Sequence, residues 1–266
     1  MNKELSNIID EFWNDYVKHK NDKYVVNPSI PIIWFGDMEA YLASKVKIVT
    51  VALNPSNVEF EARTKEEISR CSDDSFLRFK DGAELYRRNE LDEHGKKVLF
   101  RTLNNYFKDE PYTNWFNCFE KRLRKFNASY YTGTEANTAI HIDIFSSLAT
   151  SPTWGVLKKE HGSYCEELKN TALFKKLFEY LKPDIAFYSA NAEALKDVFG
   201  LGKTEILKKY SANSNCAINV YAFNDVLIIS GRNWQKPFQG MSDEFIEKAM
   251  ADIKKQFKNY LRMYDK

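Results

Sequence analysis

The sequence predicts an α/β fold in three layers, with helices on both faces of a central, mostly parallel sheet of about four strands. Apolar runs of strand length alternate along the chain with segments whose apolar residues recur at helical spacing. The run at residues 46–53 is almost continuously apolar, which is typical of a parallel strand buried on both faces. Because crossovers between parallel strands are right-handed, this alternation places helices on both sides of the sheet.

The first part of the chain is expected to begin with an amphipathic helix. Its apolar stripe consists of Leu5, Ile8, Ile9, Phe12, Trp13, Tyr16 and Val17. Residues 32–35 suggest a short strand, and Asp37 has the place of a cap for a small helix. The strand at 46–53 follows. Thr64 and Glu67 have the spacing of a capping box, so another helix is expected to begin beside them.

Residues 75–135 are charged and aromatic, and we expect them to form a helical insertion. The elements expected from there on are helices at 98–107 and 114–126, a strand at 138–144, a helix from Ser163 to Leu181, a strand at 185–189, a helix at 192–199, a hairpin of 217–223 and 226–230, and a last helix. Ser242 is the expected cap of this last helix, and Ile246, Met250, Ile253, Phe257 and Leu261 form its buried stripe.

The composition indicates one large α/β domain across residues 1–266, without repeats or linkers. The chain is 44% hydrophobic and has a net charge of +2, which neither marks nor excludes a nucleic-acid binder. No apolar run reaches the roughly 18 residues of a membrane helix, and the N-terminus does not resemble a targeting segment. The four cysteines form no CxxC pair and the histidines are scattered, so we expect no metal, no cofactor and a cytoplasmic location.

Polar residues follow each expected core strand. They are Asn54, Asp143, Asn191 and residues 230–233. The carboxyl ends of parallel strands meet at one edge of a sheet, where α/β folds bind their ligands. Turn chemistry alone also explains an Asn or Asp at any single strand end. No GxGxxG, Walker A or GxSxG sequence competes for this edge.

Asn54 is followed by Pro55, and this pair has a physical meaning. Proline disfavours the helical region for the preceding residue, so Asn54 is expected to be extended at the tip of its strand. Its amide would then be in a fixed place to hydrogen-bond a water molecule. The structural alternative is an Asx turn.

The segment Ile48-Val49-Thr50-Val51-Ala52-Leu53-Asn54-Pro55-Ser56 resembles the first motif of the uracil-DNA glycosylase superfamily. That motif is a hydrophobic strand ending in G-[IM]-N-P-G, and here Ala52 and Ser56 replace the two glycines. The resemblance implies a glycosylase-like fold, no cofactor, and an Asn54 that positions the hydrolytic water.

The family's late motif, often H-P-S-P or N-P-S-G, follows the fourth strand, and Ser230-Gly231-Arg232-Asn233 occupies this place. The family histidine is absent, because Ile228 and Ile229 stand where His-Pro would be. Stabilisation of the leaving group is therefore assigned to Arg232 or Asn233.

Asp143 suggests which base is the substrate. A base inside a duplex must be flipped out or presented on a single strand, and cleavage builds oxocarbenium character that a positioned water and an anion assist. Asn54 and Asp143 are the residues expected to supply these two. In uracil-specific relatives a strand-end Asn reads the pyrimidine, whereas an ionised Asp only accepts hydrogen bonds and suits the exocyclic amine of cytosine. The alternative role of Asp143 is a cap or turn.

Unmodified cytosine would be a hazardous target in a cell's own DNA, so the expected substrate is a modified cytosine. The resemblance then extends to bacterial anti-phage glycosylases that remove glucosylated hydroxymethylcytosine. A uracil- or thymine-DNA glycosylase acting in repair is the alternative enzyme.

Three further residues are candidates for binding the base. Phe60 stands where the family places a stacking aromatic, Trp154 lies in an expected loop, and His141 shares a strand face with Asp143. Core packing is the alternative for each. The complete set of expected substrate-binding residues is Pro55, Ser56, Phe60, His141, Trp154, Asn191, Ser230, Arg232 and Asn233.

The densest basic run, formed by Lys121, Arg122, Arg124 and Lys125, is the expected contact for the DNA backbone. The alternative is an ordinary solvated helix face. The expected partner is DNA, either single-stranded or with a base flipped out of a duplex, and protein partners stay open. Two other classes compete with the glycosylase: a non-catalytic DNA-binding relative, and a hydrolase of free nucleosides that needs no basic face.

Overall fold

The structure is a computed structural model that describes residues 1–61, 76–190, 192–231 and 236–258. The chain divides into two compact units, each assembled from three separate stretches. Unit 1 comprises Met1–Gly36, Leu53–Tyr112 and Asp143–Tyr180, and unit 2 comprises Asp37–Ala52, Thr113–Ile142 and Leu181–Lys266. The prediction that residues 1–266 form one domain stays a prediction. The expected helical insertion is shared between the units, because residues up to Tyr112 belong to unit 1 and residues from Thr113 to unit 2.

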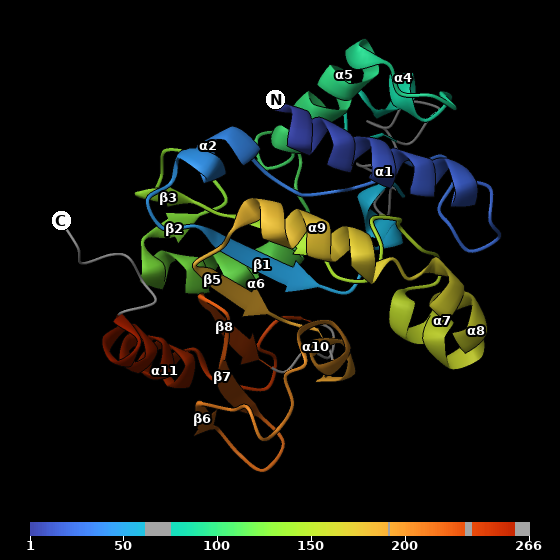
Figure 1. Cartoon of the computed structure of the whole chain (residues 1–266). Helices are drawn as coiled ribbons and strands as arrows, with labels where there is room; N and C mark the ends of the chain where they lie inside the picture. Colours follow the sequence, from blue (N-terminus) through green and yellow to red (C-terminus); the bar gives the residue numbers. More distant parts are fainter. Residues whose placement is uncertain (62–75, 191, 232–235, 259–266) are drawn as a thin grey trace. The chain divides into compact units, whose positions relative to one another are not determined.

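A six-stranded, mostly parallel sheet lies in unit 2, with the order β4-β1-β5-β8-β7-β6 (Figure 1). Its strands are β1 (Ile48–Ala52), β4 (Ile140–Asp143), β5 (Ile185–Tyr188), β6 (Lys208–Ser211), β7 (Ala217–Phe223) and β8 (Val226–Gly231). β1, β5 and β8 run parallel, and β7 runs antiparallel to both β8 and β6. The predicted α/β class is confirmed, with six strands in place of about four. β6 was not predicted, because its residues, Lys-Lys-Tyr-Ser, are half-exposed or exposed and form no apolar run.

The three parallel strands end together. Val51 of β1 is in register with Tyr188 of β5, and Tyr188 is in register with Ser230 of β8. Their carboxyl ends therefore meet at one edge of the sheet, as expected for a parallel arrangement.

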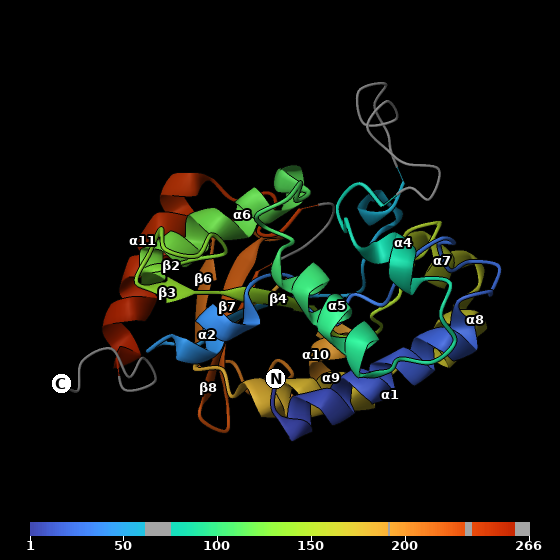
Figure 2. The ribbon, with the colours of Figure 1, turned by 90° about the horizontal axis from the view of Figure 1, so that it is seen from above.

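Unit 2 has three layers, as two neighbouring residues of β5 show. Side chains alternate between the faces of a strand, and the Phe187 ring packs against Phe126 of η2 (Arg124–Phe126), with ring centroids 5.4 Å apart. Tyr188 points to the opposite face and packs against Phe199 of α10 (Ala192–Phe199). Figure 2 shows α6 (Thr113–Leu123) and α11 (Asp243–Gln256) on one side of the sheet and α10 on the other.

The remaining elements of unit 2 are short. α2 (Met38–Ala43) begins at Asp37, whose carboxylate accepts the Ala40 N–H at 3.0 Å, as the sequence predicts. β2 (Ala128–Ser129) and β3 (Asn137–Thr138) form a separate parallel pair. The Ser242 side chain caps α11 by accepting the Phe245 N–H, which confirms the predicted start of the last helix.

Unit 1 is mainly helical. Its elements are α1 (Lys3–His19), η1 (Asn57–Glu59), α4 (Gly82–Leu85), α5 (Glu93–Asn104), α7 (Trp154–Glu160), α8 (Gly162–Leu168) and α9 (Thr171–Leu181), the last residue of which is counted with unit 2. α1 buries the predicted apolar stripe apart from Val17.

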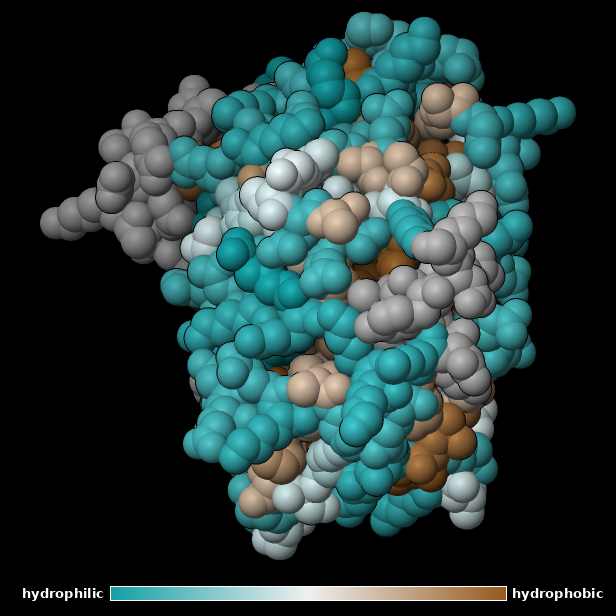
Figure 3. All heavy atoms as spheres, turned by 90° about the vertical axis from the view of Figure 1, so that its left-hand side faces the viewer, coloured by the Kyte–Doolittle hydropathy of each residue, from teal (hydrophilic) through white to brown (hydrophobic). Residues whose placement is uncertain are grey.

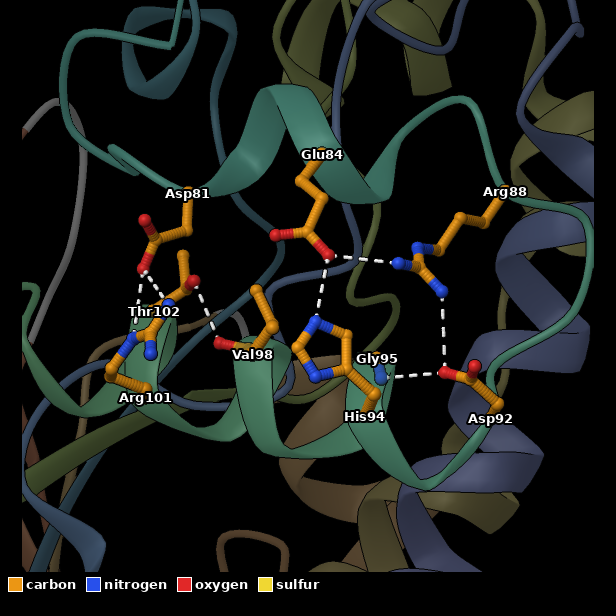
Figure 4. Close-up of polar contacts among 9 residues, drawn as sticks. All are labelled: Asp81, Glu84, Arg88, Asp92, His94, Gly95, Val98, Arg101 and Thr102. Carbon is orange, nitrogen blue, oxygen red and sulfur yellow. Dashed lines mark hydrogen bonds and ion pairs between the residues drawn. The ribbon is translucent and has the colours of Figure 1, made fainter.

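Exposed ion pairs join α4 to the start of α5 (Figure 4). Arg88 lies 2.8 Å from a Glu84 carboxylate oxygen and 3.2 Å from a carboxylate oxygen of Asp92. The same Glu84 oxygen lies 3.2 Å from His94 Nε2, and Asp92 caps α5 by accepting the Gly95 N–H. The side chains of Glu84, Arg88, Asp92 and His94 thus link a single turn of helix to its longer neighbour.

Two sequence predictions need correction. Residues 32–35 form no strand, although all four side chains are buried. The helix expected from Ser163 to Leu181 is two helices, α8 and α9, because Asn170 leaves the helical pattern. Its N–H donates to the Phe145 carbonyl at 2.7 Å and its side chain donates to Asp15 at 2.9 Å. The capping box at Thr64 and Glu67 lies outside the described residues.

No helix in the described part of the chain is both long and apolar enough to span a membrane. Hydrophilic side chains dominate the face seen in Figure 3, where the hydrophobic areas are small and separate.

Candidate functional site

The Asn54 side chain is held from three directions. Its amide nitrogen, Nδ2, lies 2.9 Å from the Pro55 carbonyl oxygen, 3.2 Å from the Leu148 carbonyl oxygen and 3.0 Å from Thr150 Oγ1. A single NH₂ group has two protons for these three acceptors, so at least one hydrogen bond is shared. The amide is therefore locked in one orientation.

The backbone around Asn54 explains why these acceptors converge. The Phe145 N–H donates to the Leu53 carbonyl at 2.9 Å, which brings the segment after β4 alongside the segment after β1. Thr150 then forms a parallel bridge with Ser56, and its hydroxyl and backbone are completely buried. Asn54 lies just after β1, as its sequence predicts, but its contacts with Leu148 and Thr150 come from more than 90 residues away along the chain.

The carbonyl oxygen of the same amide, Oδ1, is available as a hydrogen-bond acceptor. Asn54 is partly buried, and its Oδ1 accepts no hydrogen bond from any residue that the structure describes. An amide oxygen has two lone pairs, so it can accept a proton from a water molecule. The hydrogen bonds of Nδ2 fix the direction of Oδ1, and Oδ1 stays available as an acceptor.

Asp143 ends β4 and is the first residue of the third stretch of unit 1. It is partly buried, unlike the three fully buried residues that precede it in the strand. Its negative charge acts on Glu59, another carboxyl group of unit 1. Asn54 and Asp143 are thus brought into the same unit, as the predicted pairing of strand ends requires.

Glu59 is a buried carboxyl group that the sequence analysis missed. Only 4% of its surface is exposed. The Tyr106 hydroxyl donates to Glu59 Oε2 at 2.7 Å, and Arg78 Nε lies 4.0 Å from the same oxygen. Burial raises the pKa of Glu59 from 4.5 to about 7; the Tyr106 hydrogen bond and the Arg78 charge lower it, and the Asp143 charge raises it. Glu59 therefore changes charge near neutral pH.

The aromatic candidates of unit 1 pack in the core. Phe60 is 2% exposed and stacks on Phe79 with ring centroids 5.3 Å apart. Trp154 is the first residue of α7, not part of a loop, and it stacks on Phe145 at 5.3 Å. Both rings are covered, which favours the packing alternative over stacking on a base. Pro55 is buried and Ser56 partly buried, and Ser56 is the N-cap residue of η1.

His141 belongs to the core of unit 2. Its Nδ1 hydrogen-bonds Thr50 Oγ1 at 2.7 Å, and the same Thr50 oxygen contacts the Tyr130 hydroxyl. The rings of Trp115 and Phe116 pack edge-on against the imidazole. His141 is 2% exposed, so the structure favours a packing role for it too.

The late motif is described only in part. Ser230 lies in β8 and lines a pocket of about 350 Å³ in unit 2. Gly231 follows, and a side chain there would collide with the Phe238 ring. Asn191, Arg232 and Asn233 lie outside the described residues, so the described strand-end residues are Asn54 and Asp143 in unit 1 and Ser230 in unit 2.

Each cation of the predicted DNA-backbone contact has a carboxylate partner. Lys121 and Arg122 both lie 3.0 Å from Asp243, Arg124 lies 3.0 Å from Glu120, and Lys125 lies 3.0 Å from Glu247. Arg122 is also largely buried. A phosphate would have to compete with each of these carboxylates, and the buried Arg122 does not belong to a solvated face. The contact with the DNA backbone stays a prediction.

Among the described residues, no group of three His, Cys, Asp or Glu side chains is arranged to hold a metal ion. Cys118, Cys165 and Cys216 are free thiols.

Comparison of this chain with protein families, curated proteins and solved structures finds no match.

Proposed function

We propose that this protein is a DNA glycosylase that hydrolyses the N-glycosidic bond of a modified cytosine. The observation that carries the proposal is the Asn54 amide, anchored through Nδ2 at three acceptors and open at Oδ1. Such an oxygen can hold a water by one of its protons, so that a lone pair of the water faces the sugar. The location in the cytoplasm and a role in phage defence belong to the same proposal.

The reaction is a hydrolysis. The bond between the sugar C1′ and the base nitrogen breaks, and its electron pair leaves with the base. The water oxygen bonds to C1′, one water proton is released, and the base is protonated as it departs. Holding the water in place lowers the entropic cost of its attack on C1′. This requires the water to stay in line with the breaking bond.

Asp143 is proposed to read the base. A carboxylate only accepts hydrogen bonds, so it pairs with the exocyclic amine of cytosine and is repelled by the O4 oxygen of uracil. Asp143 also brings a negative charge to the unit that holds Asn54, which suits the positive charge that develops on the sugar.

The first test replaces the water-positioning group. We expect Asn54→Ala to lower kcat for base release about 10²–10³-fold, the loss typical when one preorganised contact to a transition state is removed. DNA binding should stay unchanged. Asn57→Ala is the matched control, because the Asn57 amide donates to Glu61 and takes no part in the Asn54 network.

Equal activity of Asn54→Ala and wild type would refute the role of Asn54. Salt-dependent DNA binding by a wild type that releases no base would favour the non-catalytic DNA-binding relative instead.

A further inference from the structure

The pocket of unit 2 collects polar groups whose hydrogen-bonding capacity is unused. It measures about 350 Å³ and is lined by residues of α10 and of the strands β6, β7 and β8. Figure 1 shows where these elements lie. Lys209 pairs with Asn219 across β6 and β7, and Asn219 pairs with Ser230 across β7 and β8. Cross-strand partners point to the same face, so a cation, an amide and a hydroxyl form one row along the floor of the pocket.

The central member of the row is Asn219. Its Oδ1 is buried and accepts no hydrogen bond from the described residues. Burial raises the pKa of the neighbouring Tyr221 phenol, and the Asn219 side chain lowers it. A buried acceptor without a donor costs about 1–3 kcal/mol, and an N–H group of a ligand removes that cost.

The groups beside Asn219 are donors. Lys209 is exposed and makes no ion pair with a residue in the described part of the chain. Asn213 uses its Oδ1 to accept the N–H groups of Asn215 and Cys216, both at 2.9 Å, so its amide nitrogen stays available as a donor. The pocket thus offers a cation, a neutral donor and a buried acceptor.

We infer that this pocket binds a nucleotide. The phosphate would contact Lys209, and an N–H of the base would donate to Asn219 Oδ1. The pocket volume lies at the lower end of the range of about 300–1,000 Å³ found for small-molecule sites, which limits the ligand to one nucleotide. The pocket does not depend on Asn54, but the choice of a cytosine nucleotide rests on the proposed function. The nucleotide has two sources: a free monophosphate, or one residue of a DNA strand.

Calorimetric titration of the full chain tests this inference. The probes are dCMP, deoxycytidine, inorganic phosphate and a twelve-residue dC oligonucleotide without terminal phosphates. We expect Lys209→Ala to weaken binding of the nucleotide probe about tenfold or more, the range of a charge-assisted hydrogen bond. Lys208→Ala is the matched control, because Lys208 is the adjacent residue of β6 and points to the opposite face of the sheet.

Asn219→Leu separates a binding role from a structural one. It removes the buried acceptor at similar volume, so we expect it to weaken nucleotide binding as well. Its melting temperature should stay close to that of wild type, since the substitution also removes the buried unsatisfied oxygen. Asn219→Asp keeps an acceptor but adds a negative charge, and we expect it to repel the phosphate.

The outcomes are distinct. Binding of dCMP that depends on Lys209 supports the free nucleotide, and binding of only the oligonucleotide with the same dependence supports a strand residue. Binding that is the same in Lys209→Ala, or equal affinity for dCMP and inorganic phosphate, overturns the inference. Asn54→Ala should bind every probe like wild type, so failure of the glycosylase proposal is recognised separately.

Discussion

Two asparagines, Asn54 and Asn219, differ in how the protein satisfies their side-chain amides. The Asn54 amide nitrogen donates to three acceptors in unit 1. The side chain is partly buried, and its Oδ1 accepts no hydrogen bond from the described residues. The Asn219 oxygen is buried in a pocket of unit 2 without a donor. An amide whose nitrogen is fixed and whose oxygen is an available acceptor, like that of Asn54, can orient a small molecule such as water. A buried acceptor without a donor, like Asn219 Oδ1, can gain its hydrogen bond from a ligand.

The difference extends to the surroundings. Unit 1 buries an ionisable group, Glu59, and burial raises the pKa of its carboxyl group. The unit 2 pocket is open and its cation, Lys209, is exposed.

The largest expected effect on stability concerns Glu59. Its folded pKa of about 7 lies above the ordinary 4.5, so folding favours the protonated form. The resulting stability is fully present below about pH 4.5 and is lost as the pH rises through 7. We expect the free energy of unfolding to fall by about 3 kcal/mol across this window.

Urea unfolding at pH 5 and pH 8 measures this effect. Glu59→Gln should remove most of the pH dependence, because the amide still accepts from Tyr106 but does not ionise. Glu59→Gln with an unchanged pH dependence would show that Glu59 is not the titrating group.

Thr150 tests whether the anchoring of Asn54 matters. Thr150→Val keeps the side-chain volume and removes one of three acceptors of the Asn54 amide. We expect kcat for base release to fall about tenfold with an unchanged KM, since orientation and not binding is weakened. Thr150→Ser keeps the hydroxyl and should restore activity. A change in KM alone would assign Thr150 to substrate binding.

The smallest effect is expected at Arg88, whose ion pairs with Glu84 and Asp92 lie on the surface of unit 1 (Figure 4). Exposed pairs contribute little, so Arg88→Ala should lower the free energy of unfolding by less than about 1 kcal/mol. Thermal unfolding checks it against Lys248→Ala, another exposed pair in unit 2. A much larger loss of unfolding free energy would show that these ion pairs contribute substantially to the stability of unit 1.

Elements governed by local pattern were predictable. The strands at β1 and β5, the β7–β8 hairpin and the capped helix α11 follow from apolar runs, turn residues and an N-cap. Elements that depend on contacts between residues far apart in the sequence were not predicted. The break between α8 and α9 depends on Asn170 and its bonds to Phe145 and Asp15, which no local pattern contains.

The candidate site shows the same division. Asn54 was predictable because Pro55 follows it on an apolar strand. Glu59 was not, since its partner Tyr106 lies 47 residues further along the chain. Phe60 and His141 were expected near the base because of their residue types and places in the sequence, and their burial depends on tertiary contacts that the sequence does not show. Their role in binding a base stays a prediction.

The most direct measurement is base release from matched oligonucleotides that carry uracil, cytosine or glucosylated hydroxymethylcytosine, detected as abasic sites. We predict release of the modified cytosine by wild type, and a shift of the ratio toward uracil of about 10–100-fold in Asp143→Asn, since one base contact is worth ~1–3 kcal/mol. An equal fall of activity on every base in Asp143→Asn would assign Asp143 to charge stabilisation alone. Abasic sites formed only at uracil, or at none of the three bases, would contradict the proposed function.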